Sequence, residues 1–219
     1  APADSVGLVA PAKKAIDAGI TVVNFDVKLD DKALTEAGLQ DLVFVGPDNE
    51  EGAYLAGVAL AEALGEGGKV VIIEGNPGAD NATMRKNGFV RAAEEFGLEV
   101  LESTTAHWET EEANTLMTNL ITKYPDMQGV MAANDSMALG VVKAIEAAGL
   151  TGQIQVVGFD NIGAVQELIK EGKMLATIDQ FGPMLATMCV ETGFRMINGE
   201  DITGWSKTPV QLVTAETLK

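Results

Sequence analysis

Polar and aromatic side chains recur directly after short apolar runs that have the character of β-strands. In chain order these groups stand at residues 24–26, 48–49, 81–85, 107–108, 134–135, 159–160 and 179–180. In an open α/β sheet, ligands bind at the carboxyl ends of the strands. Carboxylates and carboxamides offer paired donors and acceptors, an arginine offers a rigid fork, and Phe or Trp offers a flat apolar face. Together these groups match a ligand with vicinal hydroxyls and apolar C–H faces, such as a sugar.

Each of these residues also has a purely structural explanation. A lone Asp or Asn after a strand caps the helix that follows it. Arg85 could form an exposed ion pair with Asp80, and Trp108 could pack in the core. His107, the single histidine, stands without a second histidine or a cysteine nearby, so we expect it at the surface. The set as a whole is therefore more informative than any one member.

The sequence contains no pattern that predicts catalysis or metal binding. The Gly-Glu-Gly-Gly-Lys run at 65–69 precedes a strand and has no Ser or Thr after its lysine, which favours a turn over a phosphate-binding loop. Cysteine and histidine spacing for a metal is absent from the sequence, and Asp26, Asp30 and Asp31 do not follow the order of a calcium loop. We predict no cofactor, no metal and no enzymatic activity.

The elements that must position these residues alternate along the chain. Apolar, β-branched runs predict strands at 20–25, 42–45, 69–74, 100–105, 129–133, 154–159 and 175–178, with a late one at 210–213. Helical periodicity lies between them, at 4–18, 50–64, 80–96, 110–123, 136–148, 161–171 and 184–198. Alternating strands and helices indicate an α/β fold with doubly wound parallel sheets. The first helix, with Asp4 or Ser5 as its N-cap, has no strand before it.

Composition narrows the classes of partner. The 219 residues carry a formal charge of −17, with 47% hydrophobic residues, so the chain can bury a core but repels phosphate backbones and anionic lipid. No apolar run approaches the roughly 18–20 residues that span a bilayer. We predict no nucleic-acid partner and no direct membrane insertion.

Four ordered motifs carry a family resemblance. Residues 119–126 read Asn-Leu-Ile-Thr-Lys-Tyr-Pro-Asp, 134–140 Asn-Asp-Ser-Met-Ala-Leu-Gly, 156–160 Val-Val-Gly-Phe-Asp and 176–180 Ala-Thr-Ile-Asp-Gln. In one register from Pro2 almost to the C-terminus, the chain resembles the ribose-binding family of periplasmic sugar-binding proteins that serve ABC importers.

That resemblance implies a type I periplasmic-binding-protein-like fold, in which two α/β lobes close on a sugar by a hinge motion. It implies a sugar or polyol ligand, an ABC transporter permease as partner and a periplasmic or extracytoplasmic location. By motif, the ligand contacts would be Asp26, Arg85, Trp108, Asn134, Phe159, Asp160 and Gln180. All seven stand in the strand-end groups without any appeal to the family, and Gln180 closes the last crossover.

Two departures from the family pattern bear on the ligand. Ribose binders of this family have an arginine just after the strand-end aspartate, where this chain has Val27, and an Asn-Pro pair where it has Ala1-Pro2. Loss of the arginine removes a fork that could hold two sugar oxygens. A different pentose, a hexose or a sugar alcohol fits at least as well as ribose.

The resemblance also implies that an N-terminal part of the first lobe, about sixty residues by analogy with a two-lobe architecture, precedes the point matching Ala1. We therefore expect 48–181 with 209–219 to form a complete C-terminal lobe, and 1–47 with 182–208 to be the remnant of an incomplete N-terminal lobe. Such a chain would bind sugar weakly and would self-associate through uncovered apolar surface.

Two other functions fit the fold. The effector-binding core of a lac-repressor-type transcription regulator shares it and several of the motifs. An enzyme on a doubly wound fold is also compatible, although the sequence offers it no nucleophile, base or metal.

Overall fold

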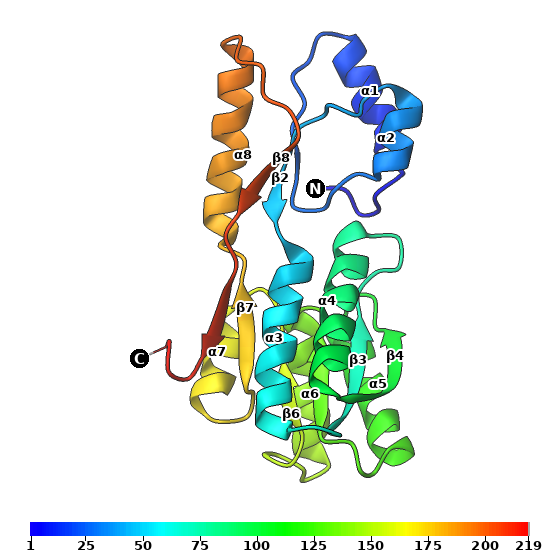
Figure 1. Ribbon diagram of the computed structural model, residues 1–219, viewed down its shortest axis with the longest axis vertical. Helices are drawn as coiled ribbons and strands as arrows, with labels where there is room; N and C mark the ends of the chain where they lie inside the picture. Colours follow the sequence, from blue (N-terminus) through cyan, green and yellow to red (C-terminus); the bar gives the residue numbers. More distant parts are fainter. Residues whose placement is uncertain (219) are drawn as a thin grey trace. The chain divides into compact units, whose positions relative to one another are not determined.

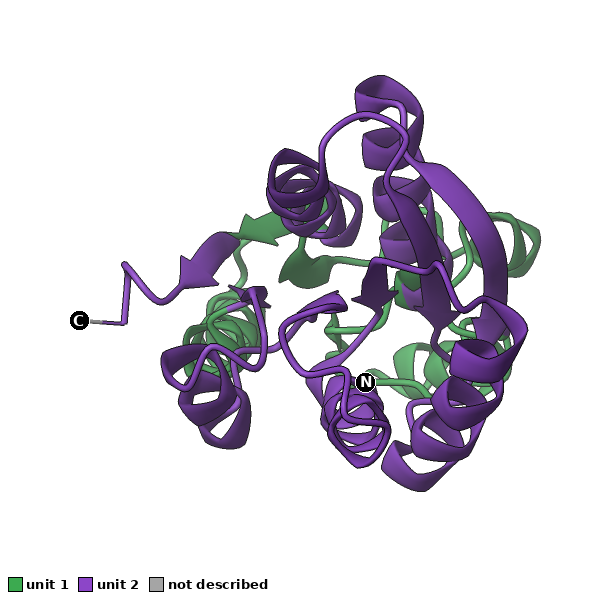
Figure 2. Cartoon of the chain, turned by 90° about the horizontal axis from the view of Figure 1, so that it is seen from below, with its two compact units in different colours: residues 1–48, 78–81, 181–209 green, residues 49–77, 82–180, 210–219 purple. Residues whose placement is uncertain are grey.

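A computed structural model describes residues 1–218, which divide into two compact units. The first consists of residues 1–48, 78–81 and 181–209, and the second of 49–77, 82–180 and 210–218 (Figure 2). The expected boundaries at 48, 181 and 209 lie within a residue or so of these limits. One difference is the short segment 78–81, whose last two residues begin a helix. It joins the first unit because the Ser5 N–H donates to the Gly78 carbonyl at 2.9 Å and the Asp80 N–H donates to Ser5 Oγ at 2.9 Å. Which unit is a complete lobe stays a prediction.

The first unit has a three-stranded parallel sheet in the order β1-β2-β8. Its elements are α1 (Val9–Asp17), β1 (Asn24–Phe25), α2 (Asp31–Ala37), β2 (Phe44–Pro47), α8 (Gly182–Ile197) and β8 (Trp205–Thr208) (Figure 1). Helix α8 packs against β1 and β2. A small apolar cluster between α1 and α2 includes Val9, Leu29 and Leu34.

The second unit is built on a six-stranded sheet in the order β4-β3-β5-β6-β7-β9. Its strands are β3 (Lys69–Glu74), β4 (Glu99–Thr105), β5 (Gly129–Ala132), β6 (Gln155–Val157), β7 (Ala176–Asp179) and β9 (Gln211–Thr214). All pairs are parallel except β7 with β9, which is antiparallel. Its helices are α3 (Asn49–Leu64), α4 (Asp80–Phe96), α5 (Thr110–Lys123), α6 (Asp135–Ala147) and α7 (Gly163–Lys170).

The sheet order makes this unit doubly wound. The chain passes from β3 to β4 in one direction and from β5 through β6 to β7 in the other, so right-handed connections place α4 and α6 on opposite faces. The direction reverses between β3 and β5, which is where ligands bind in such sheets. The inner strands have the continuous apolar burial of a sheet covered on both faces, with Val70 to Ile73 and Val130 to Ala132 fully buried.

Four elements differ from the sequence prediction. The first strand is only Asn24–Phe25, because β1 is an edge strand whose pairing with β2 begins at Asn24. The first helix begins at Val9 instead of residue 4, since Asp4 accepts the N–H groups of Val6 and Gly7 and so closes a separate turn. Helix α2 and strand β8 were not predicted. Among residues 1–218, no helix is long and apolar enough to cross a membrane.

Candidate functional site

Six of the seven predicted contacts belong to the second unit, at the carboxyl ends of its parallel strands. Trp108 follows β4, Asn134 follows β5, Asp160 follows β6 and Gln180 follows β7. Arg85 lies in the second turn of α4, which follows β3. Asp26 follows β1 and belongs to the first unit.

Arg85 is the centre of this group and is only 3% exposed. Its Nε donates to Asn49 Oδ1 at 2.9 Å, and its Nη1 donates to the Ala133 carbonyl at 2.8 Å. The same Nη1 lies 3.5 Å from Asp160 Oδ1, and Nη2 lies 3.5 Å from Gln180 Oε1. The structural alternative, an exposed ion pair of Arg85 with Asp80, is not found, because the guanidinium is buried and pairs with the Asp160 carboxylate.

Asp160 and Gln180 complete a polar triangle with Arg85. The Gln180 amide donates to Asp160 Oδ1 at 2.8 Å, and the Asp160 backbone N–H donates to the Ile178 carbonyl at 2.7 Å. Both side chains are partly exposed, in contrast to Arg85. A nearly buried cation thus holds a carboxylate and a carboxamide that are both partly exposed, and side chains of these types can bind hydroxyl groups.

The two aromatic residues differ in what they can offer. The Phe159 ring is fully buried, and the Arg85 guanidinium stacks on it at 3.7 Å from the ring centroid. Phe159 therefore supports Arg85 and presents no exposed face to a ligand in this structure. Trp108 is partly exposed, with its ring centroid 5.6 Å from the guanidinium carbon, and is the aromatic side chain that can offer a surface.

Asn134 has both of the roles that the sequence left open. Its Oδ1 accepts the Met137 backbone N–H at 2.8 Å, which makes it the N-cap of α6. The amide nitrogen of the same side chain is the group that it can offer to a ligand. His107 is at the surface, as expected, where its Nδ1 lies 2.7 Å from Glu112 Oε2.

Strained backbone marks the same strand ends. Among residues 1–218, the non-glycine residues with positive φ include Asp26 at 65°, Trp108 at 69° and Asp160 at 122°, all of them predicted contacts. Asn161, next to Asp160, has a φ of 58°. Such conformations cost of order 1–3 kcal/mol each and gather at ligand-binding sites.

Three residues that build the site were missed as site residues. Asn49 and Asp135 stand in the strand-end groups, but the family motifs do not include them among the ligand contacts. Gly75 lies directly after β3, and a Cβ there would overlap the indole of Trp108. A glycine at a strand end is the signal that could have been followed, because it permits close approach of another group.

The Asp135 carboxyl is fully buried. Its pKa is raised to about 7, chiefly by burial; the Thr177 hydroxyl that donates to it lowers the pKa, and the charge of Asp160 raises it. No group of three or more residues suited to a metal is found among residues 1–218.

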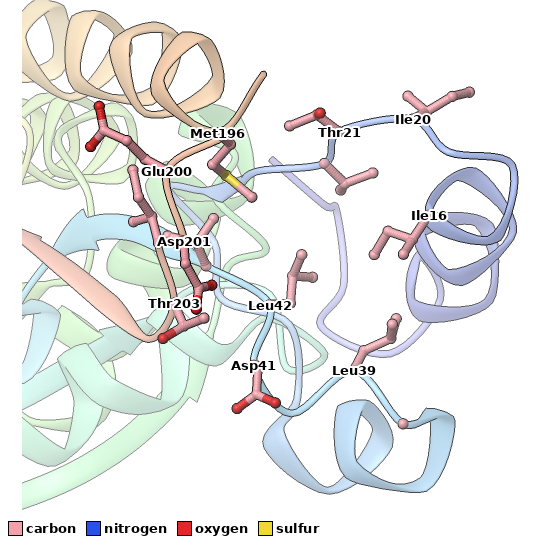
Figure 3. A pocket seen from close by; sticks show the side chains of 14 residues that line it. Ile16, Ile20, Thr21, Leu39, Asp41, Leu42, Met196, Glu200, Asp201 and Thr203 are labelled. Atoms are coloured by element: carbon pink, nitrogen blue, oxygen red, sulfur yellow. The ribbon is translucent and has the colours of Figure 1, made fainter. Parts of the chain in front are cut away.

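A pocket in the first unit contains none of the predicted residues. It has a volume of about 350 Å³ and is lined by apolar side chains such as Ile16, Leu39 and Leu42, with the carboxylates of Asp41 and Asp201 at its rim (Figure 3). It lacks a convergent set of buried donors, so the strand ends of the second unit are the stronger candidate.

Comparison with known proteins identifies relatives along the whole chain. Residues 1–201 match the model of the periplasmic binding protein domain. The D-ribose/D-allose-binding protein of Pseudomonas aeruginosa is 43% identical over 98% of this chain, which spans 68% of that protein. The D-allose-binding periplasmic protein of Escherichia coli is 37% identical over 82% of this chain and 58% of its own length.

Solved structures agree with the fold. A periplasmic solute-binding protein of an ABC transporter from Actinobacillus succinogenes, with bound D-allose, superposes with a TM-score of 0.95 at 40% identity, over 99% of this chain and 77% of that one. A Caulobacter myo-inositol-binding protein superposes with a TM-score of 0.89 at 26% identity, over 100% of this chain and 73% of that one.

Proposed function

The chain belongs to the periplasmic binding protein domain family, and on that premise we propose that it captures a sugar or sugar alcohol between two lobes and delivers it to an ABC transporter. Its task is binding, with no bond made or broken, and its place is the periplasm. The relatives described above are named as sugar-binding or solute-binding proteins, one of them of an ABC transporter, which favours this function over the effector-binding core of a transcription regulator and over an enzyme.

One observation carries the proposal: Arg85, Asp160 and Gln180 meet at the strand ends of the second unit. Arg85 is anchored by Asn49 and the Ala133 carbonyl, and Gln180 is bonded to Asp160. These side chains are fixed before a ligand arrives, so binding does not pay to order them. A sugar hydroxyl can donate to the carboxylate and accept from the guanidinium or the amide at once.

The other predicted contacts surround this triangle. We propose that Trp108 covers an apolar face of the sugar ring and that the Asn134 amide donates to a hydroxyl. Phe159 acts through Arg85, on which it stacks. Asp26 belongs to the first unit, and we propose it as a further ligand contact.

For the sugar itself we propose D-allose first and D-ribose second. A relative 43% identical is named for both sugars, and D-allose is bound in a solved structure 40% identical to this chain. Val27, beside Asp26, is 8% exposed and apolar, so it provides no fork for sugar oxygens. This lowers the expected affinity for ribose relative to binders that have an arginine there.

Isothermal titration tests the proposal, with D-allose, D-ribose and myo-inositol as ligands. Arg85→Ala should weaken D-allose binding by at least about a hundredfold, because hydrogen bonds to charged groups contribute about 1.5–3 kcal/mol each. Arg91→Ala is the matched control: Arg91 is on the same helix but stacks on Tyr54 and pairs with Glu50 and Glu51.

Binding by the wild type that Arg91→Ala preserves and Arg85→Ala abolishes supports the proposal. Equal affinities for the two variants, or no heat from any of the three ligands with the wild type, would overturn it.

We also propose that the chain self-associates. Val190, Phe194 and Ile197 form an apolar row at helical spacing on α8, and the last two are 63% and 67% exposed. Exposed apolar rows of this kind mark contact surfaces.

A further inference from the structure

Asp135 is a buried carboxylate that no ligand contact explains. It is the first residue of α6, beside Asn134, and is fully buried. Its neighbour Asn134 already caps the helix through Met137. The Asp135 side chain is therefore not needed as the cap, and its two oxygens are used elsewhere.

The hydrogen bonds of Asp135 join three segments of the site. Its Oδ1 accepts the Thr177 hydroxyl at 2.7 Å, and its Oδ2 accepts the Ile162 backbone N–H at 3.0 Å. Its own backbone N–H donates to the Phe159 carbonyl at 2.7 Å. Thr177 is in β7, three residues before Gln180, and Ile162 is two residues after Asp160.

Gly158 leaves the space that the Asp135 carboxylate occupies. A Cβ on Gly158 would overlap Asp135 Oδ1 and would lie 2.7 Å from Met174 Cε. Burying a carboxylate without a cationic partner is costly, and a neutral side chain would fill the same space at lower cost. A carboxylate at this position can accept two hydrogen bonds at once, one on each oxygen.

We propose that Asp135 is a positioning residue for the sugar site: its carboxylate fixes the relative places of the strand ends that carry Asn134, Asp160 and Gln180. The inference rests on the proposed function of that site. A binding site keeps its productive geometry only if supporting residues hold its ligand contacts in place. Removing the hydrogen bonds of Asp135 should therefore lower affinity without removing any ligand contact.

Four variants separate positioning from stability. Asp135→Ala removes both side-chain bonds, whereas Asp135→Asn keeps them, since its oxygen can accept from Ile162 and its amide can donate to the Thr177 hydroxyl. Thr177→Val removes only the hydrogen bond between Asp135 and β7. Ile145→Ala is the control, a cavity in the core ten residues along the same helix.

The readouts are D-allose affinity by titration and amide hydrogen exchange at Ile162 in the ligand-free protein. We expect affinity to fall at least tenfold in Asp135→Ala and about threefold in Thr177→Val. It should be restored to within threefold in Asp135→Asn and unchanged in Ile145→Ala. Exchange at Ile162 should be faster in Asp135→Ala than in Ile145→Ala.

The outcomes distinguish the two proposals. If the wild type binds D-allose but Asp135→Ala and Ile145→Ala have the same affinity and the same exchange at Ile162, the positioning role is overturned and the sugar site stands. If the wild type binds no sugar in the panel, the proposed function fails, and the positioning role fails with it. If Asp135→Ala does not fold, Thr177→Val with unchanged affinity overturns the role alone.

Discussion

At the scale of single residues, the site depends on two glycines that allow other side chains to approach the backbone closely. Gly75 has no Cβ where the Trp108 indole lies, and Gly158 has none where the Asp135 carboxylate lies. Both glycines stand at strand ends, and neither has a positive φ. Their role is therefore close approach, not backbone conformation.

Gly75→Ala should displace the Trp108 ring from its place over the backbone. Overpacking of this kind costs about 1–3 kcal/mol, and the ring would lose its position beside Arg85. We expect a shift in tryptophan emission and at least tenfold weaker D-allose binding. Gly163→Ala is the control, because nothing lies within 4 Å of a Cβ at that position; equal emission and affinity in both variants would contradict the role given to Gly75.

Asp135 should make stability depend on pH. Burial raises its pKa from 3.8 to about 7, so between these values the folded protein retains a proton that the unfolded chain releases. The contribution of this group to stability is full below about pH 4, falls as pH rises towards 7 and is constant above that. The loss amounts to roughly 4 kcal/mol at 1.36 kcal/mol per pKa unit.

Urea denaturation of wild type and Asp135→Asn between pH 4 and 8 measures this effect. The difference in unfolding free energy between the two proteins should change in favour of Asp135→Asn as pH rises to 7. Parallel curves over the whole range would show that Asp135 does not titrate as stated.

At the scale of elements, helix contacts determine where Arg85 lies. A Cβ on Gly88, one turn after Arg85 on α4, would overlap the Glu50 carbonyl of α3 and lie 2.8 Å from the Tyr54 nitrogen. The same pair of helices is joined by the Arg85–Asn49 hydrogen bond. The close approach of α3 and α4 therefore determines where the Arg85 guanidinium lies over the Phe159 ring.

Gly88→Ala should separate α3 from α4 and weaken sugar binding with no direct ligand contact changed. Gly57→Ala is the control for a general disturbance of this interface. Its Cβ would lie 2.6 Å from Ala92, which is on α4 seven residues beyond Arg85. We expect both variants to lower the melting temperature and only Gly88→Ala to lower D-allose affinity more than fivefold. A larger loss in Gly57→Ala would refute this account of the interface.

The sequence predicted the second unit better than the first for physical reasons. Strands such as β3 and β5 are buried on both faces, so their apolar runs are continuous and easily recognised. Strand β8, with the sequence Trp-Ser-Lys-Thr, has no such run, and its pairing with β2 joins residues about 160 positions apart. Helix α2 has seven residues, and its cap Asp30 was considered only as a member of a calcium loop.

The sequence predicts which residues form the candidate site but not how they contact one another. Residue types at strand ends indicated Arg85, Asp160 and Gln180. Their sequence does not show that Phe159 lies beneath Arg85 instead of facing a ligand, because burial of a strand-end aromatic depends on how α3 and α4 pack over it. The role of Asp135 was hidden in the same way by its neighbour Asn134, which has the more familiar capping geometry.

At the scale of the whole molecule, a formal charge of −17 combines with an exposed apolar row on α8. The charge opposes association, while burying the row favours it by about 25 cal/mol per Å² of apolar area. If the row is a contact surface, Phe194→Asp should shift the protein towards monomer in sedimentation velocity. Glu191→Asp, on the same helix, is the control, and a wild type that stays monomeric at high concentration and in high salt would refute self-association.

The central claim is that the ligand binds at the strand ends of the second unit, and mapping amide chemical shifts during a D-allose titration tests it most directly. We predict that the largest shifts occur at Trp108, Asn134, Asp160 and Gln180, and that they saturate together. Shifts concentrated instead at Leu39, Leu42 and Thr203, which line the pocket of the first unit, would contradict the claim, as would the absence of any shift.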